Sequence, residues 1–293
     1  MKLIITADDF GAAPEVNEAV ERAYRNGVLT AASLMVGAPA AADAIERAMS
    51  MPKLGVGLHI VLTENWPVLP ASAVSALVDA RGRFHSHMIW PSVKMFCVPE
   101  VRRQVAAEIE AQFGAFAASG LRLDHVNAHK HFHLHPTVAG LILEIGRRYG
   151  MTALRVPCEP VAVLRQTEPP GAGGGIPRMW AKRLGKRVTA AGIRAPDHVF
   201  GLCWSGAMTE DRLSGLLVNL PDGVSEIYLH PAIKAYPGCV PGYLYADELA
   251  ALTSTQVINM IRKKGIQLGT FTDLLKGGSP LAAMPEPSLG ASG

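Results

Sequence analysis

The alternation of short apolar segments with amphipathic ones is the feature that most constrains the fold of this chain. Residues 2–7 form an apolar, β-branched run typical of a buried strand, and the run ends in the sequence Asp8-Asp9-Phe10-Gly11. Pro14 then opens a segment whose apolar residues recur at helical spacing up to Gly27. The pattern repeats, with further strands predicted at 31–36, 54–60, 122–128, 153–156, 198–202, 226–230 and 266–269.

Strands that alternate with helices are typical of parallel βαβ units. In a chain of 293 residues they predict an α/β fold, namely an irregular TIM-like (β/α) barrel with seven or eight parallel strands in a single domain. The barrel is expected to span residues 1–276, followed by a disordered C-terminal tail at 277–293. The Pro- and Gly-rich run at 168–177 has the composition of a flexible loop or lid.

Composition argues against several classes of protein. No apolar run approaches the roughly 20 residues of a membrane-spanning helix, and two acids follow the first short apolar run too early for a signal peptide, so a cytoplasmic protein is expected. The formal net charge of +3 is too small to indicate a nucleic acid partner. The four cysteines form no C-x-x-C pair, so neither a disulfide framework nor a cysteine zinc site is expected. Whether the chain forms a homodimer is not readable from the sequence.

Histidines cluster in one short stretch, because five of the ten lie within the thirteen residues from Asp124 to Pro136. Imidazole is a common nitrogen ligand for divalent metals and titrates near neutral pH, so the cluster indicates a metal site or proton transfer. The alternative is a histidine-rich loop that binds nothing. A continued strand would place four of the five on one face, whereas a helix would pair them four apart. The five are His125, His129, His131, His133 and His135.

Polar residues also gather where the predicted strands end. The carboxyl ends of parallel strands meet at one edge of the fold, where such folds place their active sites, so these side chains are expected to converge. They are Asp8, Asp9, His59, His129, Arg155 and His230. Neighbouring strand residues point to opposite faces, so Asp8 and Asp9 can face one ligand only if the strand ends between them. Gly11 and Pro14 favour such an ending.

Two carboxylates with different orientations can divide the work of a metal site. One coordinates the ion, while the other stays free as a general base near metal-bound water. Asp9, His59 and one histidine of the cluster would supply three protein ligands and leave positions open for water, the pattern of a catalytic site. The simpler alternatives are a helix-capping Asp beside a solvated one and a strand-end histidine buried in the core.

Four motifs carry a resemblance to a known family. They are Ala-Asp-Asp-Phe-Gly at 7–11, Gly-Leu-His at 57–59, the His-x-x-x-His-x-His-x-His run that starts at His125, and Leu-His-Pro at 229–231. In this order they resemble the YdjC-like carbohydrate deacetylase family over residues 1 to about 275. The segments Phe-Gly-Ala-Ala-Pro-Glu-Val-Asn and Ala-His-Lys-His-Phe-His-Leu-His-Pro are most similar to its hopanoid-biosynthesis-associated branch, HpnK.

The resemblance implies a barrel-like fold and the hydrolysis of an N-acetyl group from an amino sugar, which in this branch sits on a hopanoid lipid. It also implies one divalent metal held by Asp9, His59 and His129, with Asp8 as the base. The family often carries an acidic residue where this chain has Asn127, so the surroundings of the ligands are expected to differ. Mixed nitrogen and oxygen ligands suit Zn, Mg, Mn or Ni and do not distinguish them.

Further roles follow as hypotheses from this chemistry. The departing amine must be protonated, and His230 is the first choice for the acid because it follows a later strand, with His131 as the second. One hypothesis is that Arg155 pairs with Asp8 and holds it ionised, and the equal alternative is an arginine exposed at the surface. His125, Asn127, His131 and His133 are expected to contact substrate or to support the ligands.

The segment 178–194 interleaves six basic residues with apolar ones, as in a basic amphipathic helix. Such a helix can rest on an anionic membrane surface, at the inner face of the membrane for a cytoplasmic protein, and this would suit a glycolipid substrate, although a solvated helix face is the simpler interpretation. Two other functions stay open. One is a metal-dependent phosphoesterase or sugar isomerase on a similar barrel, and the other is a non-catalytic protein that binds metal.

Overall fold

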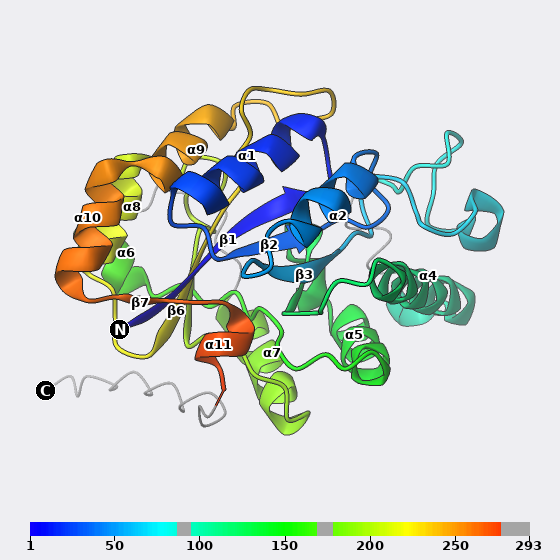
Figure 1. Cartoon of the computed structure of the whole chain (residues 1–293). Coiled ribbons are helices and arrows are strands. Elements are labelled where there is room, and N and C mark those ends of the chain that lie inside the picture. Colours follow the sequence, from blue (N-terminus) through cyan, green and yellow to red (C-terminus); the bar gives the residue numbers. More distant parts are fainter. Residues whose placement is uncertain (87–94, 169–177, 277–293) are drawn as a thin grey trace, which may run out of the picture.

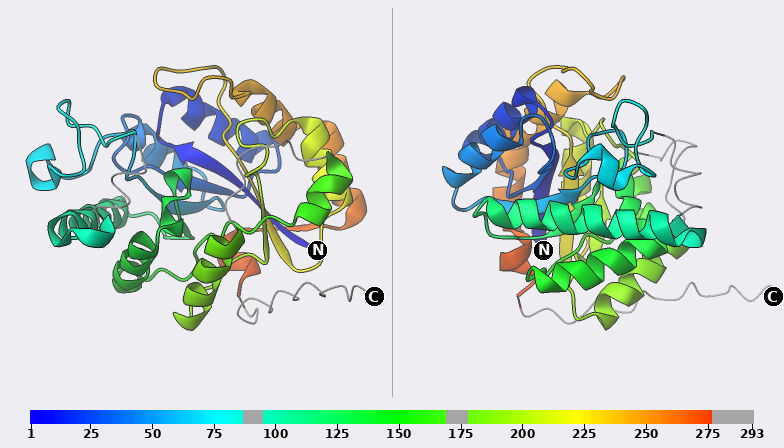
Figure 2. Two further views of the ribbon diagram at one scale, coloured as in Figure 1. Left: turned by 180° about the vertical axis from the view of Figure 1, so that it is seen from behind. Right: turned by 90° about the vertical axis from the view of Figure 1, so that its right-hand side faces the viewer.

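The computed structural model describes residues 1–86, 95–168 and 178–276. A curved sheet runs through the middle of the molecule, and helices pack around its outside (Figure 1 and Figure 2). The tail predicted at 277–293 and all but the first residue of the lid predicted at 168–177 lie outside the described residues.

Seven strands form one sheet in the order β4-β3-β2-β1-β6-β5, and β7 pairs with β1 at its amino end. Every ladder is parallel, as the alternation of strands and helices predicted. The strands are β1 (Lys2–Phe10), β2 (Ala31–Leu34), β3 (Gly55–Ile60), β4 (Val126–Ala128), β5 (His198–Phe200), β6 (Val224–Leu229) and β7 (Gln267–Leu268).

The segment 152–158 spans the space between the two edge strands, β4 and β5. The backbone N–H of Val126 donates to the carbonyl of Ala153 (3.0 Å). The N–H of Leu154 donates to the carbonyl of Arg194, ahead of β5 (2.9 Å). These contacts are isolated bridges, and no ladder joins β4 to β5 within the described ranges.

Pro157 gives a physical reason for this interruption, because proline has no N–H to donate to a neighbouring strand. The strand predicted at 153–156 is accordingly a bridging segment and not a ladder strand. The structure shows an α/β fold with a parallel half-barrel sheet. The prediction of a full TIM-like barrel with seven or eight strands goes further than the sheet that is present.

Helices connect successive strands and cover the outer face of the sheet (Figure 1). Proline opens α1, α4 and α5 at the first helical position, where its missing N–H costs no helical bond. The helices are α1 (Pro14–Asn26), α2 (Ala41–Met49), α4 (Pro99–Ala118), α5 (Pro136–Arg148), α6 (Val161–Thr167), α7 (Arg178–Ala190), α8 (Glu210–Val218), α9 (Tyr245–Thr253), α10 (Thr255–Lys264) and α11 (Phe271–Leu274), with short 3-10 turns η1 (Ala71–Val74) and η2 (His129–Leu134).

The central strands are buried along their length, which sets the polar residues on them apart. All residues of β3 and β6 are buried, as are all those of β1 after Lys2. A charged side chain in such a strand is costly unless it is paired, so Asp8, Arg155 and Glu226 must have partners inside the fold. Their partners define the site at the carboxyl ends of the strands.

Candidate active site

The backbone of Asp9 turns the end of β1 so that both of its acids face the site. Asp9 adopts φ 62°, in the left-handed region, and the register of β1 against β2 shifts between Ala7 and Phe10. The sequence predicted that the strand ends between Asp8 and Asp9. The strand instead continues to Phe10, and the turn of the backbone at Asp9 has the same effect. A non-glycine residue in this region costs on the order of 1–3 kcal/mol, and such outliers gather at functional sites.

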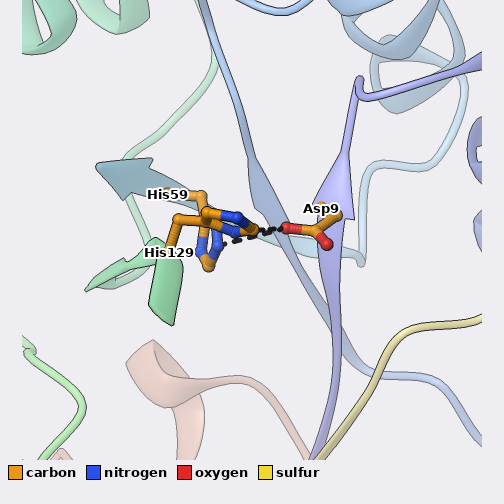
Figure 3. Close-up of side chains that lie close together, drawn as sticks. All are labelled: Asp9, His59 and His129. Carbon is orange, nitrogen blue, oxygen red and sulfur yellow. Dashed lines mark hydrogen bonds and ion pairs between the residues drawn. The ribbon is translucent and has the colours of Figure 1, made fainter. Parts of the chain in front are cut away.

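Asp9, His59 and His129 form the group in the described chain that could hold a metal ion. One ligand atom from each lies within 4.8 Å of the other two. Asp9 Oδ1 is 3.3 Å from His59 Nε2 and 3.1 Å from His129 Nδ1. Figure 3 shows the two imidazoles, from β3 and from the start of η2, directed at the carboxylate from β1.

Asn127 fixes the far side of the His59 ring. The Asn127 Oδ1 atom lies 2.6 Å from His59 Nδ1, which leaves Nε2 facing Asp9. The amide nitrogen of Asn127 donates to Asp8 Oδ1 (3.2 Å) and to Ser33 Oγ (2.8 Å). Asn127 therefore touches both a candidate ligand and the second carboxylate of β1.

Glu64 lies behind His129 on the other side of the site. Its carboxylate is 3.6 Å from His129 Nε2 and pairs with the Lys130 ammonium. The hydrogen bond to His129, with Lys130, lowers the pKa of Glu64 to about 2. Burial by itself lowers the pKa of His129, but the nearby Asp9 and Glu64 carboxylates outweigh it and raise that pKa to about 9. The histidine must lose this proton before it can bind a metal.

Arg155 holds Asp8 from the inside of the fold. Its guanidinium is fully buried and donates to both Asp8 oxygens (2.5 and 3.0 Å) and to Glu226 Oε1 (2.6 and 2.9 Å). It also lies over the Tyr228 ring, 4.4 Å from the ring centre. Burial by itself raises the pKa of Asp8, but the Arg155 charge outweighs it and holds the pKa well below the usual value. Asp8 is therefore ionised at neutral pH.

His230 and His131 lie on the same pocket as Asp8 and the candidate ligands. His131 Nε2 is 2.9 Å from the Tyr228 hydroxyl, while the His230 ring lies beside Tyr243 at 5.3 Å between ring centres. Burial, with His133 nearby, lowers the pKa of His131 well below its ordinary value, so His131 is neutral at pH 7. A neutral imidazole is a poorer proton donor than a protonated one, which counts against His131 for that task.

His125 and His133 lie deeper than the sequence pattern indicated. Both are fully buried. His125 contacts Ser33 and Asp124, and His133 packs behind His131 with ring centres 5.8 Å apart. Of the two roles predicted for them, this placement favours support of the site over contact with substrate, and that role stays a prediction.

A groove of about 620 Å³ opens from the candidate ligands toward the surface. Asp9 and His129 form its inner end, and it continues past Glu64. Its outer wall carries Trp66, which is 45% exposed and whose ring stacks with the Arg83 guanidinium, 4.6 Å from the ring centre. An exposed indole beside a polar groove offers an apolar face for a ligand.

Several residues of the site were not predicted from the sequence. Glu226 and Tyr228 are in β6, four and two residues before His230 respectively, and a charged residue in that apolar run was a usable signal. Ser33 is buried in β2, and nothing in its local pattern marks it. Glu64 follows β3 in an irregular stretch, so its contact with His129 depends on the tertiary fold.

The fold and the site together define a class: an α/β protein with a group that could hold a metal, beside an ionised carboxylate, at the carboxyl ends of parallel strands. Residues 2–263 match the family described as YdjC-like protein. The chain belongs to this family. Within the residues that the structure describes, no helix is long and apolar enough to cross a membrane.

Curated relatives match over nearly the whole chain. The carbohydrate deacetylase of Geobacillus stearothermophilus is 31% identical and covers 93% of this chain and 98% of its own. A human carbohydrate deacetylase is 30% identical, with 94% of this chain and 91% of its own covered. A solved structure from Enterococcus faecalis, described provisionally as a cellobiose-phosphate cleavage protein, has a TM-score of 0.74 at 29% identity, with 93% and 98% covered.

Proposed function

We propose that this protein is a metal-dependent hydrolase that removes the N-acetyl group from an amino sugar. The observation that carries the proposal is the pairing of the Asp9, His59 and His129 group with a separate carboxylate, Asp8, that Arg155 keeps ionised. The carbohydrate deacetylase relatives point to the same chemistry. An amide is hydrolysed when water is activated, the oxyanion is stabilised and the amine is protonated.

The residues fit a divalent metal by their chemistry. They offer one carboxylate and two imidazoles from three elements, and a three-residue set leaves positions open for water and substrate. The mixture of oxygen and nitrogen donors does not select among Zn, Mg, Mn and Ni. When bound, such a metal supplies a Lewis acid that makes water more acidic and the acetamide carbonyl more electrophilic.

The protein's own groups would move the protons. Asp8 is ionised and fixed by Arg155, so it can accept a proton from the attacking water without reorienting. His230 would donate a proton to the departing amine from the other side of the pocket. The Tyr228 hydroxyl and His131 face the pocket between them and would contact the acetyl group or the sugar.

For the substrate we propose an N-acetylglucosaminyl hopanoid lipid, in line with the hopanoid-biosynthesis-associated sequence segments. The groove past Trp66 offers mixed apolar and charged walls to the remainder of such a glycolipid. Helix α7 exposes Lys182, Lys186 and Met179, whereas Leu184 is buried against the protein. A peripheral membrane contact through α7 stays a prediction, and flotation with anionic liposomes at low salt would test it.

Acetate release tests the proposed activity. Purified protein is expected to release acetate from N-acetylglucosaminyl lipid or from N,N′-diacetylchitobiose, to lose this activity after dialysis against a chelator and to regain it with one of Zn, Mg, Mn or Ni. Acetate release that is unaffected by chelation would contradict the metal dependence. No acetate release from any N-acetylated sugar would contradict the deacetylase proposal.

The same preparations distinguish the other functions. A metal-dependent phosphoesterase would release inorganic phosphate from sugar phosphates, and a sugar isomerase would convert an aldose into a ketose without any acetate. Cleavage of cellobiose phosphate would release glucose, the activity provisionally ascribed to the Enterococcus faecalis protein. A non-catalytic metal-binding protein would bind the ion with none of these products, and the variant Asp8→Asn would then behave like the parent.

A further inference from the structure

A buried network of hydrogen bonds leads from Asp124, beside the start of α11, to His59. It passes from the Asp124 carboxylate to His125, then to Ser33, then to Asn127 and finally to His59 Nδ1. All five residues are at most 4% exposed. In a dry interior each donor must meet an acceptor, so the direction of every bond is restricted.

The first group of this hydrogen-bond network, the Asp124 carboxylate, can accept hydrogen bonds but cannot donate them. The Asp124 carboxylate receives the backbone N–H groups of Phe271 (3.2 Å) and Thr272 (2.8 Å) at the start of α11. Burial by itself raises the pKa of Asp124, but the bonds from His125 and from the backbone outweigh it, so its pKa lies below the usual value. An ionised carboxylate only accepts, and His125 Nδ1, 3.1 Å away, must therefore carry a hydrogen.

The Ser33 hydroxyl oxygen accepts a hydrogen bond from the Asn127 amide. His125 Nε2 is 3.1 Å from Ser33 Oγ, and whether that nitrogen accepts or donates, the hydroxyl oxygen keeps a lone pair. That lone pair faces Asn127 Nδ2 at 2.8 Å. The other hydrogen of the same amide nitrogen points at Asp8 Oδ1 (3.2 Å), an oxygen that also accepts from the Arg155 guanidinium (3.0 Å).

The amide of Asn127 can therefore adopt only one orientation. Flipping it would place its oxygen against the Asp8 carboxylate, while Asn127 itself is fully buried. With the nitrogen on that side, Asn127 Oδ1 faces His59 Nδ1 at 2.6 Å, so Nδ1 must be the protonated nitrogen of His59. In a neutral His59 ring with hydrogen on Nδ1, Nε2 presents a lone pair toward Asp9 Oδ1 at 3.3 Å.

Two acceptor atoms that face each other at this distance fit a cation between them. We propose that Asp124, His125, Ser33 and Asn127 are positioning residues that hold His59 in the tautomer whose Nε2 binds a divalent metal. The inference rests on the proposed metal dependence, and it assigns to these four residues a role in metal affinity. Hydrogen-bond partners of ligating histidines commonly change metal affinity by about 10- to 100-fold.

Two glycines of β3 make room for the first two members of this hydrogen-bond network, Asp124 and His125. A Cβ atom at Gly57 would lie 2.5 Å from the His125 ring, and one at Gly55 would lie 2.5 Å from the Asp124 carboxylate. Neither approach is compatible with a side chain. The glycine of the Gly-Leu-His motif therefore leaves room for His125, which is a reason for that motif distinct from metal binding.

Two variants of Asn127 test whether its oxygen, as the acceptor for His59 Nδ1, is what controls metal affinity. Asn127→Asp keeps an oxygen for His59 Nδ1, with a proton held between its other oxygen and Asp8, as in two carboxylates that share one site, whereas Asn127→Leu removes that oxygen at similar volume. We expect the Leu variant to lose about 10- to 100-fold in affinity for Zn(II) or Co(II), measured by competition with a chromophoric chelator, and the Asp variant to stay within a few-fold of the parent. Equal affinities in the two variants would overturn the proposal.

Ser33 should act only through Asn127, which a double-mutant cycle can show. Ser33→Ala is expected to weaken Co(II) binding and to alter its visible absorption spectrum in the parent, and to have no further effect in the Asn127→Leu background. A matched control is Ser225→Ala, since Ser225 is a fully buried serine that is not part of the hydrogen-bond network. Equal losses from Ser33→Ala in both backgrounds, or an equal loss from the control, would contradict this role.

The tautomer itself can be observed without any turnover. In zinc-loaded protein, ¹⁵N correlation spectra are expected to show His59 with hydrogen on Nδ1 and zinc on Nε2. Zinc on Nδ1 would overturn the proposal. Protein that binds zinc with the expected tautomer but releases no acetate would contradict the deacetylase function alone, whereas protein that binds no divalent metal would contradict both.

Discussion

Both carboxylate oxygens of Asp8 are bonded to the guanidinium of Arg155, at 2.5 and 3.0 Å, at the inner end of the candidate pocket, where Asp8 is 2% exposed. The adjacent residue, Asp9, instead faces His59 and His129. Two neighbouring acids thus have different partners because the backbone turns at Asp9. The first prediction follows from this division.

Asp8→Asn is expected to abolish turnover and to leave the metal bound. The amide has nearly the same shape but cannot accept a proton, and loss of a general base commonly lowers kcat by about 10²- to 10⁴-fold. Asp9→Asn is the matched control, because it removes a ligand oxygen's charge and should lower metal content as well as activity. Metal content and acetate release are measured on the same samples, and loss of metal from Asp8→Asn would show that the roles are assigned wrongly.

Arg155→Met is expected to raise the pKa of Asp8, since burial then acts without the opposing positive charge. The acid limb of kcat/KM against pH should move to higher pH. In the parent, the depressed pKa of Asp8 contributes stability that is present above about pH 4 and is lost as pH falls toward the folded-state pKa. The variant lacks this contribution.

Removing Arg155 also leaves Asp8 and Glu226 buried without their cation, which costs about 3–5 kcal/mol in comparable buried pairs. Urea unfolding at pH 7 measures this loss. Arg155→Lys keeps the positive charge but not the two parallel hydrogen bonds of the guanidinium. It should therefore lose less stability than Arg155→Met, and its acid limb should move less far toward high pH. An unchanged acid limb in both variants would mean that Asp8 does not control that limb.

The sequence predicted the elements of the fold where local patterns decide them. The apolar run at 2–7 and the prolines that open α1 and α5 were sufficient, because burial periodicity and the missing proline N–H act locally. Whether β4 and β5 join across 152–158 depends on long-range pairing, and no local pattern reports it. The structure shows a parallel half-barrel sheet at this point, and a full TIM-like barrel stays a prediction.

The histidine cluster shows a similar limit. Neither a continued strand nor a regular helix forms there, because Lys130 and His131 adopt φ of 50° and 54°. Non-glycine residues enter this region only when their surroundings compel them, so their own sequence does not predict it. The turn separates His129, which faces Asp9, from His133, which is fully buried. Strand spacing alone would have placed both on one face.

Glu64 was not predicted, and it offers a further test. Glu64→Gln removes the negative charge behind His129 and is expected to weaken metal binding by about 10- to 100-fold, since a carboxylate partner makes a ligating imidazole more basic. It also lowers the pKa of His129 from about 9 in the metal-free protein. Chelator competition gives the affinity, and Glu110→Gln, at a carboxylate on α4 that pairs with Arg148, is the control. An affinity equal to that of the control would mean that Glu64 does not influence the metal.

Trp66 tests whether the groove binds substrate. Trp66→Ala is expected to raise KM for a glycolipid or disaccharide by about 10-fold with a smaller change in kcat, because the ring would bind ground state and transition state alike. Trp66→Phe keeps an aromatic face and should recover most of the affinity. Met49→Ala, at an exposed apolar residue of α2 that does not line the groove, is the control. A KM unchanged in Trp66→Ala would place the substrate elsewhere.

His230 and His131 can be separated by the leaving group of the substrate. An amine leaves only after protonation, whereas p-nitrophenolate leaves an acetyl ester without it. If His230 is the acid, His230→Gln should lower amide hydrolysis by about 10²- to 10⁴-fold and lower p-nitrophenyl acetate hydrolysis far less. His131→Gln should affect both substrates alike, because burial keeps His131 neutral and it can only position a reactant. The reverse pattern between the two variants would assign the proton donor to His131.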